Sequence, residues 1–405
     1  MYCDKVRLYH TRDCMKVAII GYGVVGKGVD ILLENSSIEV SKIFDRPSRL
    51  HENNRTCDNF QIILEDDSID VIVETLGGLE PAHSFIIQAM KAGKSVVSAN
   101  KAVIAHYFEE FHKIAEENGV YFMFEASVGG TIPMLKTIYE TRDVDSITKV
   151  GGILNGTSNY ILSKMELESL SFEEALKQAQ EAGYAEYDPT DDIEGIDIRN
   201  KIMIASSISF KTVAPLKEIP TMGISKITKK DMAQFKKFNL SCKLFAMAQR
   251  IQNTYSISVE PTLFSRNSIE SSVISNFNLA MVETPSNGLV SIIGQGAGRL
   301  PTAHAMVTDL KYIEKKAPIR EFTKDNDVVY CENTKECVYY IRTKLSRDDF
   351  PSSIQNSIIY QNAEMYFVEG ITRKDLIEIQ ALDSSLFYAR CDENVYEFIK
   401  KEVNA

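Results

Sequence analysis

Val17-Ala18-Ile19-Ile20-Gly21-Tyr22-Gly23-Val24-Val25-Gly26 is the stretch of sequence that decides the fold. It begins with a short apolar run, passes through glycines in the spacing G-x-G-x-x-G, and continues with apolar residues at helical spacing to Leu33. In a strand–turn–helix, the first glycine makes a tight turn, the second lets the backbone approach a pyrophosphate, and the third allows close packing. Exposed N–H groups at the helix start favour an anion. The stretch predicts a dinucleotide site made by Gly21, Tyr22, Gly23, Val24, Val25 and Gly26.

Strands and helices continue to alternate after this turn. Apolar runs predict strands at Val40–Phe44, Asp70–Val73, Ser95–Val97 and Val120–Phe124, and amphipathic stretches predict helices at Pro81–Lys91 and Ala102–Glu117. This alternation indicates a parallel sheet that is buried on both faces. We therefore expect an α/β fold with a Rossmann-type domain over residues 15–130, preceded by an unstructured leader at 1–14.

The residues after the second strand bear on the choice of cofactor. An acidic residue about 20 positions beyond the glycines binds the ribose 2′-hydroxyl of NAD in this kind of site, and Asp45 stands near that position. Arg46 and Arg49 are close to it and could instead bind the 2′-phosphate of NADP. The local chemistry leaves NAD and NADP both open.

The remainder of the chain has a different pattern and predicts two further units. A capping box at Ser171–Glu174 opens a helix, a long helical pattern runs through Ile208, and residues 255–300 favour strands. We expect an α+β domain over 131–300 and a helix at about 300–317 that returns to the first domain. Residues 325–405 form a small α+β module, with strands predicted at Val338–Leu345, Glu364–Val368 and Leu376–Ile379 and a helix at Ser352–Ile359.

Composition excludes several classes of function. The 405 residues carry 45 Lys and Arg against 56 Asp and Glu, and a net charge of −11 disfavours nucleic-acid and membrane-surface partners. No apolar run reaches the roughly 18–20 residues of a membrane span. The seven cysteines are scattered without metal or redox spacing, which predicts free thiols and a cytoplasmic protein. None of the six histidines has a catalytic spacing, so if the protein is an enzyme, we expect another residue type to carry its proton chemistry.

Lysine and carboxylate residues provide that chemistry. Four carboxylates fall within residues 186–192, ahead of Asp197 and Lys201, which are four apart and share a helix face. Lys201 precedes the apolar run 202–205, so its ammonium should emerge from a mostly buried helix. Burial lowers a lysine pKa, and a neighbouring carboxylate opposes that shift while fixing the ammonium in place. The pair predicts a proton donor; an ordinary ion pair is the alternative.

Two strand ends carry further candidates. Asn100 and Lys101 follow the fourth strand, where the carboxyl ends of a parallel sheet face the ligand crevice, so both should lie near the nicotinamide. Glu125 ends the fifth strand beside Gly129 and Gly130. A carboxylate next to exposed carbonyls suits a hard cation, although a purely structural turn is the simpler interpretation.

Seven blocks of sequence in order resemble the homoserine dehydrogenase family, which interconverts aspartate 4-semialdehyde and homoserine. They span about residues 15–320 and read VAIIGYGVVGKGV, ETLGG, SANK, EASVGGTIP, GGILNGTSNYIL, GYAEYDPTDDIEGIDIRNK and GAGRLPTA. The resemblance implies a Rossmann-type domain, a catalytic and dimerisation domain, and a C-terminal module like the ACT domains that bind an amino-acid effector such as threonine. It also implies a homodimer or dimer of dimers that acts in threonine, methionine and isoleucine biosynthesis.

The same resemblance assigns roles to residues. Lys201 would be the acid/base and Lys101 a second catalytic lysine, while Glu186 and Asp197 would bind the substrate with support from Asp192. Besides the glycine turn, the residues implied at the NAD or NADP site are Asp45, Arg46, Thr75, Asn100, Lys101, Gly183 and Gly298. A sodium site would use Glu125 and the carbonyls of Val128, Gly130 and Ile132. Two alternatives remain: another amino-acid dehydrogenase of this layout, and a non-catalytic nucleotide and amino-acid sensor.

Overall fold

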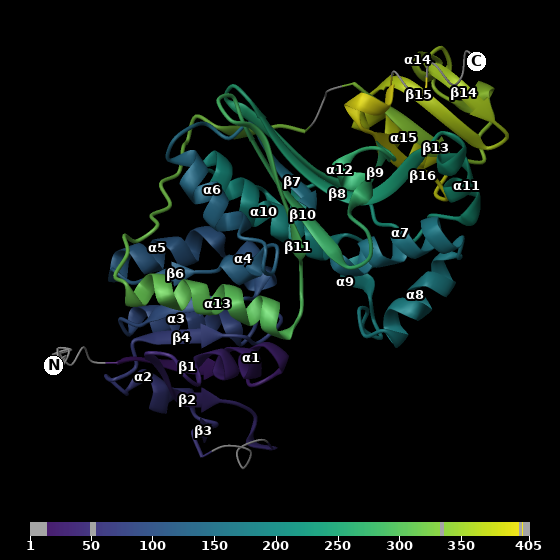
Figure 1. The fold of residues 1–405 in the computed structure, drawn as a ribbon. Coiled ribbons are helices and arrows are strands. Elements are labelled where there is room, and N and C mark those ends of the chain that lie inside the picture. Colours follow the sequence, from purple (N-terminus) through teal and green to yellow (C-terminus); the bar gives the residue numbers. More distant parts are fainter. Residues whose placement is uncertain (1–13, 49–53, 333–335, 397–398, 400–405) are drawn as a thin grey trace, which may run out of the picture.

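The N-terminal part of the chain is a parallel sheet with helices on both faces (Figure 1). This computed structural model describes residues 14–48, 54–332, 336–396 and 399, so the predicted leader, apart from Cys14, and Arg49 lie outside the described residues. The elements are β1 (Met15–Ile20), α1 (Val24–Leu33), β2 (Ile38–Phe44), β3 (Thr56–Cys57), α2 (Phe60–Leu64), β4 (Val71–Glu74), α3 (Ala82–Lys91), β5 (Ser95–Ser98), α4 (Lys101–His106), α5 (Phe108–Asn118) and β6 (Phe122–Met123).

The strand order of this sheet creates the ligand crevice. The strands run β3-β2-β1-β4-β5-β6 and all pair in parallel, with β1 between β2 and β4. Because the direction of strand succession reverses between β1 and β4, the crevice opens at their carboxyl ends. The predicted Rossmann-type sheet is confirmed. Two details differ: the last strand is reduced to β6, and the helix predicted at 102–117 is broken at Tyr107 into α4 and α5.

Helix α13 (Arg299–Glu314) brings the chain back to this sheet. It packs against α1, and its Ala303, Met306 and Leu310 share one apolar core with Val17 and Ile19 of β1. The approach requires a glycine at position 28, since a Cβ there would lie 2.8 Å from the Arg299 carbonyl oxygen. A helix that begins 176 residues after the end of β6 thus contributes to the core of the first sheet.

A second sheet carries the middle of the chain. Its elements, with their helices, are α6 (Met134–Arg142), β7 (Lys149–Ile153), α7 (Gly156–Glu168), α8 (Phe172–Glu181), α9 (Thr190–Ile193), α10 (Ile196–Phe210), α11 (Lys229–Lys237), β8 (Leu240–Ile251), β9 (Thr254–Ser265), α12 (Ile269–Ser272), β10 (Phe277–Thr284) and β11 (Gly288–Gln295). The strands run β11-β10-β7-β8-β9, each antiparallel to its neighbour. The predicted capping box at the start of α8 is present.

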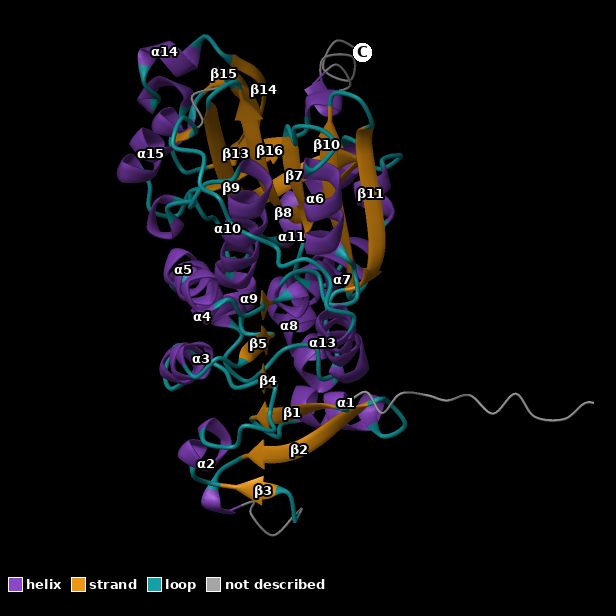
Figure 2. Cartoon of the chain, turned by 90° about the vertical axis from the view of Figure 1, so that its left-hand side faces the viewer, coloured by secondary structure: helices purple, strands orange, loops and turns teal. Residues whose placement is uncertain are grey.

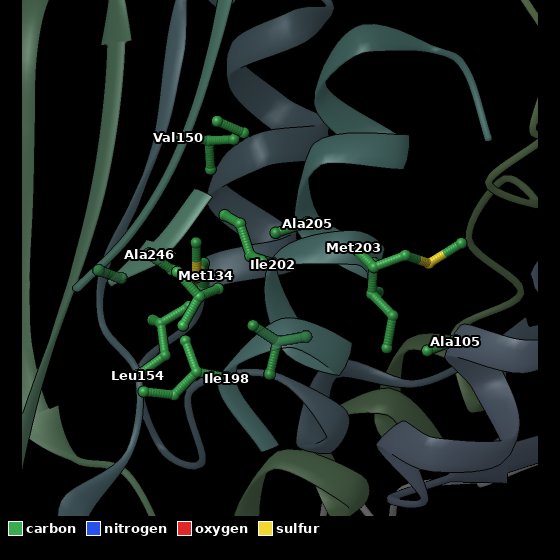
Figure 3. Close-up of a cluster of buried hydrophobic side chains, with 14 of the residues drawn as sticks. Ala105, Met134, Val150, Leu154, Ile198, Ile202, Met203, Ala205 and Ala246 are labelled. Atoms are coloured by element: carbon green, nitrogen blue, oxygen red, sulfur yellow. The ribbon is translucent and has the colours of Figure 1, made fainter. Parts of the chain in front are cut away.

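Helix α10 lies at the centre of the molecule. It is buried along almost its whole length, and Figure 3 shows its side chains between residues of the sheet and of α6. Ile198 and Ile202 lie beside Leu154 and Met134, while Met203 lies on the side of Ala105 in α4. A helix packed on all sides has little freedom to move, so the residues of its first turns are held rigidly.

The C-terminal residues extend the second sheet. The elements are β12 (Val329–Tyr330), β13 (Cys337–Arg342), α14 (Ser352–Gln355), β14 (Ile358–Asn362), β15 (Met365–Ile371), α15 (Arg373–Leu382) and β16 (Phe387–Cys391). The strands run β16-β13-β15-β14, and β16 pairs in parallel with β9, so one sheet crosses both units (Figure 2). The order is that of a split β-α-β-β-α-β unit. On α11, the buried Asp231 accepts hydrogen bonds from Tyr340 (2.7 Å) and Arg342 (2.9 Å) and ties the two units together.

Two predictions for this unit are wrong. The segment Leu376–Ile379 is part of helix α15 rather than a strand, because Thr372 and Asp375 form a capping box and the apolar residues recur at helical spacing. The helix predicted at Ser352–Ile359 ends as α14 after one turn, and its second half becomes strand β14, which pairs with β15. Among the described residues, no helix is long and apolar enough to cross a membrane.

A buried histidine makes the stability of this fold sensitive to acid. His112 on α5 lies among the rings of Phe108, Phe122, Phe124 and Phe322. Burial lowers its pKa from 6.5 to about 4, so the unfolded chain binds the proton first as the pH falls. We expect the free energy of unfolding of the wild type to fall as the pH drops below 6.5. Between pH 7 and pH 5, this fall should be about 2 kcal/mol smaller in His112→Phe than in the wild type.

Urea unfolding at the two pH values measures this difference. His304→Phe, at an exposed position, is the matched control and should follow the wild type. Parallel pH dependence of His112→Phe and the wild type would show that His112 does not carry the effect.

Candidate active site

Two lysines and a buried carboxylate form the centre of the site. Gly195, with φ of +79°, lets the chain turn into α10, so that Asp197 lies in the first turn and Lys201 one turn later. The Lys201 Nζ atom is 2.6 Å from Asp197 Oδ2 and also donates to the Leu154 carbonyl at 2.7 Å. The pair predicted from the i,i+4 spacing is therefore formed, and its ammonium has a fixed direction.

Lys101 reaches the same carboxylate from the other domain. It is the first residue of α4, directly after β5, and its Nζ atom is 3.0 Å from Asp197 Oδ1. The Lys101 side chain is 43% exposed, whereas Asp197 is 4% exposed and Lys201 10%. Asp197 and Lys201 are thus buried at the base of the site, and the Lys101 side chain is the one accessible to solvent. It joins the carboxyl edge of the parallel sheet to the start of α10.

Asn155 belongs to the site although the sequence reasoning did not select it. It caps α7, with its Oδ1 atom accepting the Ser158 N–H at 2.8 Å. Its Nδ2 atom donates to Asp192 Oδ1 at 2.6 Å and to Asp197 Oδ2 at 2.9 Å. An Asn before a helix is a common cap, and a cap that uses the amide oxygen leaves two N–H donors free. These two free N–H donors were the feature of the sequence that could have identified Asn155 as a partner for the carboxylates.

The charges shift the acidity of the cluster. Burial alone would raise the pKa of Asp197, but Lys101 and Lys201 outweigh it and hold the pKa well below the usual range. Asp197 conversely raises the pKa of Lys101. Asp192 has a raised pKa, because of burial first and the neighbouring Asp197 second. Ionised Asp197 therefore forms an ion pair with each of the two lysines and holds both ammonium groups in place.

Two other predicted residues, Gly183 and Glu186, lie in the loop between α8 and α9. Gly183 follows α8 with φ of +76°, and a Cβ there would meet nothing within 4 Å. The Glu186 side chain is exposed and makes no hydrogen bond with the other described residues of the site. The loop that carries both is tied to α7 by the Thr157 hydroxyl, which donates to the Tyr184 carbonyl at 2.7 Å.

The glycine turn has the geometry expected of a nucleotide site. Gly21 has φ of +89°, and a Cβ on Gly26 would lie 2.2 Å from the Gly21 carbonyl oxygen, so only glycine fits there. Thr75 Oγ1 donates to the Gly21 carbonyl at 2.5 Å and links the turn to the end of β4. Gly23 caps α1 without a side-chain hydrogen bond, and Val24 is 67% exposed, so the helix start faces solvent. This end is suited to a pyrophosphate.

The remaining cofactor candidates lie at the edges of the crevice. Asp45 is buried at the end of β2 and accepts the Arg46 N–H at 2.7 Å, while the Arg46 side chain is exposed. Asn100 caps α4 and donates to the Gly78 carbonyl at 2.7 Å. Gly298 is the residue before α13, with φ of +130°.

Glu125 and the glycine-rich turn after it lie at the junction of the two domains. The buried Glu125 carboxylate accepts the N–H groups of Leu135 (3.0 Å) and Lys136 (2.8 Å) at the start of α6. Burial, with Asp309 nearby, raises its pKa to about 8. A Cβ on Gly130 would lie 2.4 Å from the Gly296 carbonyl oxygen, so the turn packs tightly on the segment that leads to α13.

Comparison with known proteins agrees with this architecture. Residues 21–125 match the family model for the NAD binding domain of homoserine dehydrogenase, and residues 133–310 match the homoserine dehydrogenase model. The chain is 36% identical to a homoserine dehydrogenase of Bacillus subtilis over 74% of this chain and 73% of that protein. It is 32% identical to that of Pseudomonas aeruginosa over 91% of this chain and 90% of the relative.

Solved structures show the same likeness. A homoserine dehydrogenase from Thiobacillus denitrificans superimposes with a TM-score of 0.83 at 29% identity, covering 93% of this chain and 98% of the other. A hyperthermophilic archaeal homoserine dehydrogenase in complex with NADPH superimposes with a TM-score of 0.65 at 25% identity, covering 75% of this chain and 99% of the other.

The glycine turn after β1 and Lys101 after β5 lie at the same carboxyl edge of the parallel sheet, where ligands bind. With the matching NAD binding domain, this site identifies the chain as an NAD(P)-dependent oxidoreductase. More particularly, the chain belongs to the homoserine dehydrogenase family. The family resemblance predicted from the seven sequence blocks is therefore confirmed.

Proposed function

We propose that this oxidoreductase interconverts L-aspartate 4-semialdehyde and L-homoserine, with Lys201 moving the proton between its Nζ atom and the substrate oxygen. The nicotinamide, when bound, supplies or accepts the hydride. The observation that carries the proposal is the convergence of Lys101 and Lys201 on Asp197, at 3.0 and 2.6 Å. Two ammonium groups in a mostly buried cluster stabilise the negative charge that develops on oxygen as the aldehyde is reduced.

Each residue of the cluster has a separate task. The Asp197 carboxylate holds both ammonium groups and accepts a hydrogen bond from the substrate. Lys101, the more exposed of the two lysines, contacts the substrate oxygen from the nucleotide side. Glu186, on the loop between α8 and α9, gives negative charge for the substrate ammonium group, with support from Asp192. Asn155 orients the two aspartates and completes their hydrogen bonds.

The cofactor is held by the glycine turn, with Thr75, Asn100, Gly183 and Gly298 around it. The uncapped start of α1 supports this assignment, because its N–H groups are available to a pyrophosphate. We favour NADP over NAD, with the exposed Arg46 on the 2′-phosphate and Asp45 fixing the backbone of Arg46. An NADPH complex is known for the archaeal relative.

Homoserine oxidation followed at the nicotinamide absorbance, with NAD and NADP in parallel, tests the function. We expect turnover with both and a higher kcat/KM with NADP. Replacement of Arg46 by alanine should raise the KM for NADP about tenfold and leave that for NAD nearly unchanged, since only NADP has the charged group. Turnover only with other aldehydes or keto acids would favour another amino-acid dehydrogenase. Cofactor binding without any turnover would favour the sensor.

A sodium ion is a structural part of this proposal. Glu125 and the carbonyls of Val128, Gly130 and Ile132 would supply hard oxygen donors, and each oxygen of the ionised Glu125 carboxylate keeps a lone pair beyond its bond to α6. A bound cation would favour this ionised form and oppose the burial that raises the Glu125 pKa. The ion would lock the turn against the segment before α13. Melting temperatures in sodium chloride and in tetramethylammonium chloride at equal ionic strength test it; equal values would count against the site.

The wider assignments follow from the same family. We divide the chain into a nucleotide domain (15–130, completed by 300–317), a catalytic and dimerisation domain (131–300) and an ACT-like module (325–405) that binds an amino-acid end product. The split β-α-β-β-α-β order of the module supports this. Threonine titration by calorimetry tests the effector, and sedimentation tests the homodimer or dimer of dimers. We place the enzyme in the cytoplasm, in threonine, methionine and isoleucine biosynthesis; the six described cysteines are all free thiols.

A further inference from the structure

A second buried carboxyl group lies beside the site, and the proposed reaction does not use it. Glu74 is the last residue of β4 and is completely buried. It lies at the carboxyl end of the sheet, directly across from Ser98, its partner in the neighbouring strand β5. One carboxyl oxygen accepts the Leu76 N–H at 2.7 Å, and the other accepts from the Ser98 hydroxyl at 2.5 Å. A buried acid needs a reason to be present, because burying it is costly.

The hydrogen bonds that start at Glu74 lead to Lys101. The Ser98 hydroxyl oxygen, which is held by Glu74, accepts the Asn100 N–H at 3.1 Å. Asn100 then caps α4 by accepting the Val103 N–H at 3.2 Å, and Lys101 is the first residue of that helix. The turn from β5 into α4 is therefore fixed at each residue that precedes Lys101.

We propose that Glu74 is a positioning residue that acts through Ser98 and Asn100 to keep the Lys101 ammonium at Asp197. This inference rests on the role proposed above for Lys101. The partners of Glu74 are a hydroxyl, a backbone N–H and an amide side chain, all of them neutral, so the group makes no ion pair that would explain its presence. Without the Glu74–Ser98 bond the start of α4 could shift, and a shift of about 1 Å in a reacting group can cost up to about 100-fold in rate.

A double-mutant cycle between Ser98→Ala and Lys101→Ala tests the proposal. Ser98→Ala should lower kcat/KM for the semialdehyde about tenfold in the wild-type background and less than about twofold when Lys101 is already alanine. Equal factors in both backgrounds would overturn the proposal, since a general loss of order does not depend on Lys101. If Lys101→Ala alone leaves activity intact, the proposed role of Lys101 fails instead, so the two failures are distinguishable.

Matched variants separate positioning from folding. Ser95→Ala makes the same change at the other end of β5, where it removes a hydrogen bond from the Tyr121 N–H, and should leave activity unchanged. Glu74→Gln keeps the shape and should retain most of the activity, whereas Glu74→Leu should behave like Ser98→Ala. The NADPH dissociation constant of Ser98→Ala, measured by fluorescence, should stay within about twofold of the wild type. A loss of NADPH affinity equal to the loss of kcat/KM would also overturn the proposal.

Discussion

Replacing Lys201 by alanine is expected to lower kcat for homoserine oxidation about 1,000-fold while the affinity for NADP changes little, because a positioned acid/base contributes about 100-fold to 10,000-fold. The Lys201 side chain is 10% exposed, and its ammonium is directed by Asp197 and by the Leu154 carbonyl. No histidine is available to replace it in the cluster described here. Steady-state kinetics and cofactor fluorescence together give the two quantities.

The control is a lysine in the same kind of pair. Lys164 on α7 forms an i,i+4 ion pair with Glu168 at 2.5 Å, but on the surface and away from the site. Lys164→Ala should therefore leave kcat unchanged. If Lys201→Ala loses as much cofactor affinity as kcat, Lys201 is a structural lysine and the acid/base must be sought elsewhere.

The parts of the site that depend on local spacing could be predicted from the sequence. The glycine turn was predictable because its steric constraints lie within six residues: Gly21 has a positive φ, and a Cβ on Gly26 would clash with the Gly21 carbonyl oxygen. The Asp197–Lys201 pair was predictable because residues four apart share a helix face. The position of Lys101 followed from the rule that ligands bind at the carboxyl ends of parallel strands.

The parts that depend on contacts between distant segments could not be predicted in this way. Asn155 contacts Asp192 and Asp197, which lie 37 and 42 residues later, and Glu74 contacts Ser98 across two strands. A cap or a strand end gives no indication of which distant partner it will meet. The carbonyl ligands of the sodium site and the role of Glu186 come from family resemblance alone, and they stay predictions.

The errors in the C-terminal unit have a local physical cause. Leu376 and Ile379 are three apart, and this spacing fits a helix face, but a short apolar run also fits a buried strand. The capping pair Thr372 and Asp375 was the signal that decides between them. The strand β14 was missed because it gains its stability by pairing with β15.

Asp197→Asn is the change expected to lower stability and rate together. The substitution leaves the ammonium groups of Lys101 and Lys201 facing a neutral amide in a place where the side chain is 4% exposed. Breaking a buried ion pair by removing one partner costs about 3–5 kcal/mol, because the remaining charge is uncompensated. Both lysines also lose the group that orients them, so kcat should fall at least about 100-fold.

Two further variants show whether the uncompensated charge is the cause. Adding Lys101→Met to Asp197→Asn removes one of the two ammonium groups that have lost their carboxylate partner. The double variant should therefore be more stable in urea than Asp197→Asn alone. Asp192→Asn is the matched single change, and it should cost much less stability, since both lysines form their ion pairs with Asp197. Equal costs for the two asparagine variants would contradict a central role of Asp197, because they would mean that the loss comes from the amide and not from the lysines. A double variant less stable than Asp197→Asn would also show that the uncompensated charge is not the cause. The Lys101 side chain would then contribute to stability through its packing and not through its charge.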